Sequence, residues 1–164
     1  MKKRIMWTGF VITAIALIVF SVISAEVYYD NSVAYSQSYL RAYMAAFDET
    51  RTVDMLDGDY AKQLSEALGG ARVTFLTAEG EFIADSEDED DSSRSMRPEV
   101  RAAIEAGEGF DTRTSQTLGV TFLYYCKQFD GYLVRIAERT QSLWGIYLDA
   151  LPAVAVFLVG DAVV

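Results

Sequence analysis

Histidine is absent from this chain of 164 residues, and cysteine occurs only once. Without histidine there can be no HExxH zinc motif, and the sequence also lacks a Gly-Lys-Ser/Thr loop that would hold phosphates. Cys126 cannot form a disulfide within the chain. Its apolar surroundings indicate a buried thiol, with a reactive thiol as the alternative. These absences predict a chain that is not an enzyme and has no cofactor.

Basic residues are scarce, with 14 Lys and Arg against 24 Asp and Glu and a net charge of −10. This excess of negative charge disfavours a nucleic acid partner, because the phosphate backbone attracts cations. The densest acidic run predicts a solvated loop or, as the alternative, a site for a divalent cation such as Ca²⁺ or Mg²⁺. The candidate metal ligands are Asp85, Glu87, Asp88, Glu89, Asp90 and Asp91. The run lacks the spacing and glycine of an EF-hand loop, which favours the solvated loop.

Charge is missing altogether from residues 5–25, which follow Lys2, Lys3 and Arg4. Twenty-one helical residues span roughly 31 Å, the thickness of a bilayer core, so residues 5–25 are predicted to form a transmembrane helix. The preceding basic residues place the N-terminus, residues 1–4, in the cytoplasm. A cleaved signal peptide is the alternative, but its apolar region is usually only about 7–15 residues long.

A second apolar stretch begins at Leu143, with aromatic residues at its start as at a membrane interface. Asp149, Pro152 and Asp161 interrupt it. We predict a second transmembrane helix over residues 142–164, truncated before a cytoplasmic signalling part. Residues 26–141 would then form a domain outside the cytoplasm.

Neither glycine nor proline occurs between Gly9 and Gly58, so the first span can continue outward as one long helix ended by Asp57-Gly58. An apolar row with spacings of four and three follows this helix: Tyr29, Val33, Ser36, Leu40, Tyr43 and Phe47. The row either packs on the chain's own sheet or pairs with a second subunit, and both interpretations stay open.

The remaining residues predict a sheet with two short helices. A helix over 60–68, capped by Asp59, precedes a hairpin over 72–86 that turns at Gly80. A helix from Pro98 to Gly107 buries one apolar stripe. The stripe consists of Val100, Ala103 and Ile104. Further strands are expected over residues 110–118, 120–129 and 132–137. Residues 120–129 are apolar on both faces, and Asp130-Gly131 forms the turn after them.

An ordered series of short motifs runs through residues 60–138. The motifs are Arg72-Val73-Thr74, Glu79-Gly80, Ala84-Asp85-Ser86, Arg97-Pro98-Glu99-Val100, Gly107, Gly109, Arg113 to Ser115, Leu118, Leu123-Tyr124 and Val134-Arg135. The series resembles the extracytoplasmic sensor of PhoR-type bacterial histidine kinases, whose outer domain is PAS-like and of the Cache kind. Where many such sequences have Asn-His before Arg-Pro-Glu, this chain has Arg94-Ser95.

The resemblance implies an α+β fold: a long N-terminal helix continuous with a transmembrane helix, then a PAS-like five-stranded antiparallel sheet with an inserted short helix, then a second transmembrane helix. It implies a two-pass protein of the bacterial cytoplasmic membrane that senses a stimulus as a homodimer. A kinase module outside this chain would act on a response regulator. The stimulus would be a small ligand, a divalent cation or an extracytoplasmic protein. A chemoreceptor or diguanylate cyclase sensor, or a non-signalling scaffold, are the alternatives.

A PAS-like domain would place its pocket between the sheet and the inserted helix. The candidate lining residues are Arg97, Arg113, Phe122 and Tyr124, with Arg135 as a further anion-binding group. Ion pairing of these arginines with the abundant acids is the alternative, as is a core position for Tyr124.

Overall fold

The computed structural model describes residues 2–46, 52–87, 97–114, 120–140, 142, 145–149, 151–152 and 155–156. The chain divides into two compact units. One comprises Met1–Ser32 and Gln141–Val164, and the other, called the sheet unit below, comprises Val33–Thr140.

The helix α1 spans Lys2–Ala45, so it begins in the first unit and ends in the sheet unit. Its stretch Trp7–Ala45 contains a window of 18 residues with mean hydropathy 2.4, and only 6% of that window is buried. By length and composition this helix can cross a membrane. Within the described part of the predicted second span, residues 145–149, 151–152 and 155–156 are helical. Most of that span lies outside the described residues, so it stays a prediction.

The prediction that α1 continues to Asp57-Gly58 is wrong, because α1 ends at Ala45 and a short 3-10 helix follows at Val53–Met55. The absence of glycine and proline permits a helix but does not enforce one, since packing contributes most of the stability of a helix in a protein. The last buried side chains of α1, Leu40 and Met44, lie in its final turns.

The helix α2, Gly58–Ala67, is capped by Asp57. The prediction that Asp59 caps it is wrong. Asp57 has extended backbone angles, and its Oδ1 accepts a hydrogen bond of 2.8 Å from the backbone N–H of Tyr60. Asp59 lies inside the first turn, where its charge is favourable to the helix dipole but cannot cap the helix.

Replacing Asp57 with alanine is expected to lower the free energy of unfolding by about 1 kcal/mol, since it removes this cap. Asp59→Ala is the matched control and should cost less, because only the dipole interaction is lost. Urea unfolding of the full chain in detergent micelles, followed by far-UV circular dichroism, measures both. Equal losses from the two substitutions would contradict the assignment of Asp57 as the cap.

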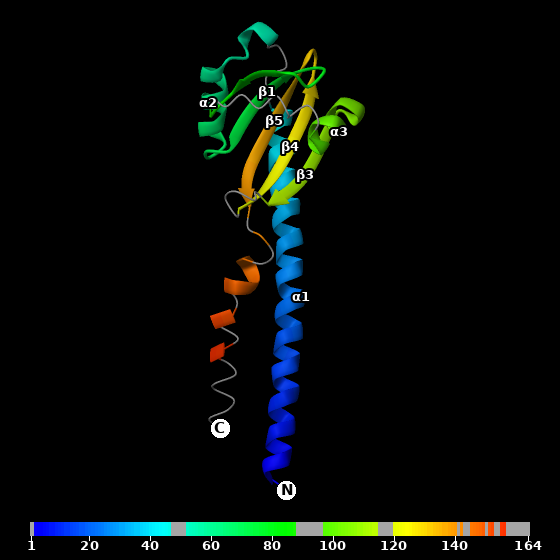
Figure 1. Ribbon diagram of the computed structural model, residues 1–164, viewed down its shortest axis with the longest axis vertical. Coiled ribbons are helices and arrows are strands. Elements are labelled where there is room, and N and C mark those ends of the chain that lie inside the picture. The colour runs from blue at the N-terminus through cyan, green and yellow to red at the C-terminus, as the bar shows by residue number, and fades with distance from the viewer. Residues whose placement is uncertain are drawn as a thin grey trace. The chain divides into compact units, whose positions relative to one another are not determined.

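Five strands form one sheet in which every neighbouring pair is antiparallel (Figure 1). They are β1 (Arg72–Thr77), β2 (Phe82–Asp85), β3 (Glu108–Thr114), β4 (Thr121–Phe129) and β5 (Tyr132–Thr140), in the order β2-β1-β5-β4-β3. The predicted hairpins are confirmed, with positive φ at Gly80 and Gly131. The third strand begins at Glu108, two residues before its predicted start, and the fifth continues to Thr140. The expected α+β class with a five-stranded antiparallel sheet is confirmed.

One face of the sheet, called the α1 face, packs against α1 and α2. Leu40 and Met44 of α1 and Leu64 of α2 share a buried cluster with residues such as Phe75 and Tyr125 of the sheet. Val33 and Tyr43 of the predicted apolar row also pack against this cluster. Packing on the chain's own sheet is therefore confirmed for Val33, Leu40 and Tyr43, whereas Phe47 of the row lies outside the described residues. Pairing with a second subunit stays a prediction.

The opposite face, called the α3 face, is covered in part by the helix α3, Pro98–Ala106. As predicted, Pro98 begins this helix and Gly107 ends it in the left-handed conformation. Val100 and Ala103 are fully buried, but Ile104 is 38% exposed and the prediction that it is buried is wrong. The third inward position belongs to Glu99, which is fully buried.

Gly109 of β3 lies directly beneath α3. A Cβ atom at this position would stand 2.3 Å from the backbone oxygen of Glu99 and 2.7 Å from the Cβ of Ala102. Glycine is therefore required for α3 to lie this close to the strand.

Candidate functional site

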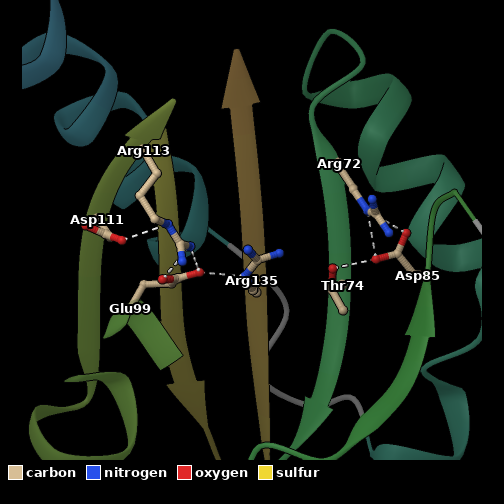
Figure 2. A network of polar contacts seen from close by, with 7 residues as sticks. All are labelled: Arg72, Thr74, Asp85, Glu99, Asp111, Arg113 and Arg135. Atoms are coloured by element: carbon tan, nitrogen blue, oxygen red, sulfur yellow. Dashed lines mark hydrogen bonds and ion pairs between the residues drawn. The ribbon is translucent and has the colours of Figure 1, made fainter. Parts of the chain in front are cut away.

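The α3 face carries an ion-pair network centred on Glu99 (Figure 2). A terminal guanidinium nitrogen of Arg113 donates to both carboxylate oxygens of Glu99, at 2.7 and 2.9 Å. The Nε of Arg135 donates to Oε1 of the same carboxylate at 2.9 Å. One buried carboxylate is thus shared by two guanidinium groups that come from β3 and β5.

The sheet register places these two arginines on the same face. Arg113 pairs with Phe122, and Arg135 pairs with Cys126, two positions of β4 that lie four residues apart. Side chains alternate between faces along a strand, so both pairs point to the α3 face. Tyr124 lies between them on β4, and the guanidinium carbons of Arg113 and Arg135 stand 4.2 and 4.6 Å from its ring centre. Both cations therefore interact with one aromatic ring.

Asp111 completes the network through an ion pair of 2.8 Å with Nε of Arg113. Two acids thus balance two arginines. The network is closed at β5, where the Arg135 side chain is 6% exposed, and is more open at β3, where those of Arg113 and Asp111 are 28% and 26% exposed. Exchange with solvent is easier on the β3 side.

A second network, on β1 and β2, engages the first residues of the predicted acidic site (Figure 2). The buried carboxylate of Asp85 accepts from Nε of Arg72 at 3.0 Å and from the Thr74 hydroxyl at 2.6 Å. The backbone N–H of Glu87 also donates to Asp85, at 2.8 Å, while the Glu87 carboxylate pairs with Arg72. Local partners therefore use the oxygens that a cation would need.

The remaining predicted metal ligands lie outside the described residues. These are Asp88, Glu89, Asp90 and Asp91. Within the part of the chain that the structure describes, no group of three or more His, Cys, Asp or Glu is placed to hold a metal ion. The cation site stays a prediction.

A third network joins α1 to the opposite face of the sheet. Nε of Arg41 and one of its terminal nitrogens donate to Oε1 of Glu108 at 3.0 and 2.8 Å, and the Tyr125 hydroxyl donates to Oε2 at 3.1 Å. The hydrogen bond from Arg41 is the main cause that lowers the pKa of Glu108. Burial, followed by the bond to Glu108, raises the pKa of Tyr125.

Removal of both partners tests how strongly Arg41 and Glu108 hold α1 to β3. A double-mutant cycle with Arg41→Gln and Glu108→Gln is expected to give a coupling of about 0.5–1 kcal/mol at neutral pH, as for exposed bidentate pairs. The pKa of Glu108 is lower in the folded chain than its ordinary value of 4.5. The coupling is therefore complete above that value and is lost as the pH falls through the folded-state pKa. Urea unfolding of the four proteins at neutral and acidic pH measures it, and a coupling of equal size at both would contradict the ion pair.

Comparison with known proteins identifies no relative. No family model matches this chain, and neither curated proteins nor solved structures give a match. Function must therefore be inferred from the fold and its networks.

Three of the four predicted pocket residues meet on the α3 face. Arg113, Phe122 and Tyr124 lie on β3 and β4 with their side chains on this side of the sheet, and the rings of Phe122 and Tyr124 stand 6.1 Å apart. Arg97 is the residue that precedes the first turn of α3. The alternative interpretation of the arginines was ion pairing with acids, and the structure has such pairs for Arg113 and Arg135. The shared partner is the buried carboxylate of Glu99 and not an acid at the surface.

Glu99 was not identified from the sequence as a site residue and was named only within the motif Arg97-Pro98-Glu99-Val100. A signal was available, because Glu99 precedes the buried Ala103 by four residues and so lies on the same side of the helix. An acid on the inward stripe of a helix requires a buried cationic partner.

Proposed function

We propose that this chain is the sensing part of a membrane receptor, with the sheet unit outside the cytoplasm. The observation that carries the proposal is the continuity of α1, which is a single helix of 44 residues. Its first part is apolar and exposed, as a membrane span would be, and its last turns are buried against the sheet through Leu40 and Met44. A helix of this length extends over about 66 Å, enough to cross a bilayer and still reach a folded domain.

The proposed topology rests on the basic residues at the N-terminal end of the apolar stretch. Lys2, Lys3 and Arg4 keep the N-terminus in the cytoplasm, and residues 26–141 lie outside. The second span, over residues 142–164, returns the chain through the bacterial cytoplasmic membrane. This two-pass arrangement gives a stimulus outside the cell a covalent route inward.

Within the receptor class, we favour the sensor region of a two-component histidine kinase with a PAS-like outer domain. The support is the ordered motif series between residues 60 and 138, together with a five-stranded antiparallel sheet that has α3 inserted between β2 and β3. In this proposal the chain is a homodimer and performs no catalysis itself. The kinase module and its response regulator lie beyond this chain.

Signal transfer is supported by the connection between α3 and α1. Gly107 ends α3, and the next residue, Glu108, binds Arg41 of α1. Gly109 then lies beneath α3 on the other face. A displacement of α3 would move the start of β3 and, through it, α1. A stimulus produces such a shift only if it binds the two arrangements with different affinity.

Two measurements test the proposal. Alkaline phosphatase fused after Thr140 should be active, since that enzyme folds only outside the cytoplasm, whereas a fusion before Lys2 should be inactive. The reading frame after Val164 then separates the receptor classes: a HAMP linker with a histidine helix supports the kinase, and a methyl-accepting coiled coil or a cyclase domain would replace it. An inactive fusion at Thr140 would contradict the outside location, and a stop codon at the end of the chain would favour a scaffold.

A further inference from the structure

The two arginines of the α3 face are held in place by groups other than Glu99. Arg113 is paired with Asp111, and both guanidinium groups lie over the ring of Tyr124. All of these groups belong to β3, β4 and β5, strands that hydrogen-bond to one another along their length. The pair of cations is therefore organised by the sheet itself and does not need α3 to form.

Glu99, by contrast, is delivered by α3, a helix of nine residues. Among the described residues, the buried apolar cluster under α3 has five members, Leu76, Val100, Ala103, Cys126 and Leu133, of which α3 supplies two. One of these two is the small side chain of Ala103. The third buried side chain of α3 is Glu99, so its carboxylate contributes a large share of the attachment of the helix.

We propose that Arg113, Arg135 and Tyr124 form a binding site for a small carboxylate, that Glu99 is its resting occupant, and that an incoming carboxylate replaces Glu99 and releases α3. The inference rests on the proposed sensor function for its signalling consequence, whereas the binding step stands on the geometry alone. The more exposed side at Arg113 and Asp111 provides the entry.

The charges favour a monoanionic group. Arg113 donates to both oxygens of the Glu99 carboxylate and Arg135 donates to one of them, so the two guanidinium groups together hold one planar carboxylate. Replacing one carboxylate with another leaves no buried charge uncompensated, so the exchange avoids the large cost of an unpaired arginine. Phosphate would bring a second negative charge beside Asp111, which already balances Arg113.

The chain contains a natural reporter for the release of α3. Its single cysteine, Cys126, is fully buried in the cluster with Val100 and Ala103 of α3. Burial is the main cause that raises the pKa of Cys126 to about 12, which keeps the thiol protonated and unreactive while α3 is docked. Undocking would expose the thiol and lower its pKa.

The experiment measures alkylation of Cys126 by iodoacetamide, an uncharged reagent, on the full chain in lipid nanodiscs. Acetate, a monoanion, is titrated at constant ionic strength against chloride and phosphate. We expect a saturable rise in the alkylation rate of about tenfold or more with carboxylate, as for a local opening, and none with chloride or phosphate. Arg113→Gln should abolish the rise, whereas Arg41→Gln, which removes an equal charge on the opposite face, should preserve it.

A second variant separates binding from release. In Glu99→Ala the site is vacant, so alkylation should be fast without any addition, and acetate should raise the unfolding temperature more than in the unaltered chain. The inference is overturned if carboxylates change neither the alkylation rate of the unaltered chain nor the unfolding temperature of Glu99→Ala. An equal response to phosphate would overturn the carboxylate class. Either failure leaves the topology and reading-frame tests of the receptor unaffected.

Discussion

Replacing Glu99 with alanine is expected to lower the free energy of unfolding of the sheet unit by about 3–5 kcal/mol, the usual loss when one partner of a buried ion pair is removed. Arg135 is only 5% exposed, and without Glu99 its Nε loses the carboxylate that balances it. Arg113 keeps Asp111 and is more exposed, so it loses less. The loss therefore comes mainly from the uncompensated charge at Arg135.

Urea unfolding in detergent micelles, followed by far-UV circular dichroism, measures this loss. Glu105→Ala removes an exposed acid from the same helix and is the matched control, with an expected change within about 0.5 kcal/mol. The double substitution Glu99→Met with Arg135→Met should recover much of the stability, because it removes both members of the buried pair. If Glu99→Ala were as stable as Glu105→Ala, the buried network would not hold α3 to the sheet.

Replacing Gly109 with alanine is expected to be the second most damaging change, with a loss of about 1–3 kcal/mol from overpacking. The added Cβ would meet a backbone oxygen of α3 at 2.3 Å, and a backbone atom cannot move aside by changing its rotamer. Either α3 lifts from β3 or the strand bends. In both cases Cys126 becomes more reactive toward iodoacetamide.

Gly107→Ala is the comparison for Gly109→Ala. Gly107 has φ of +86°, and the described residues place no atom within 4 Å of an added Cβ, so alanine there strains the backbone without a collision. It should destabilise the chain without the same gain in Cys126 reactivity. Gly109→Ala and Glu99→Ala should also be non-additive, because each releases α3. Full additivity of their effects on unfolding would show that they act on different parts of the fold.

Most of the fold could be predicted from the sequence because its signals are local. Gly80 and Asp130-Gly131 marked the two tight hairpins, and Pro98 with Gly107 marked the two ends of α3. The incorrect predictions concern helix ends that depend on packing between residues far apart in the sequence or on the backbone angles. The residue types in and after α1 do not predict that the helix ends at Ala45. Two aspartates in close succession could each cap α2, and only the backbone angles select Asp57.

The candidate site was predictable only in part. Arg113 and Tyr124 could be placed on one face because strand alternation and the order of the hairpins fix it. The sequence does not assign Glu99 to this site, because its partners Arg113 and Arg135 lie 14 and 36 positions away along the chain. Those separations are set by how α3 lies on the sheet. That placement requires that Gly109 has no side chain, and the pattern of apolar residues in the sequence does not indicate this requirement.

The neighbouring residues Glu108 and Gly109 serve opposite faces of the sheet, the first binding Arg41 and the second lying under α3. Side-chain direction alternates at every residue of a strand. A single residue inserted between Gly107 and Glu108, with the start of β3 kept in place, would exchange the two faces: the carboxylate would point at α3 and the glycine at α1. Both helices would lose their attachment through one change of chain length. The spacing between the end of α3 and this dipeptide is therefore as restrictive as the identity of either residue.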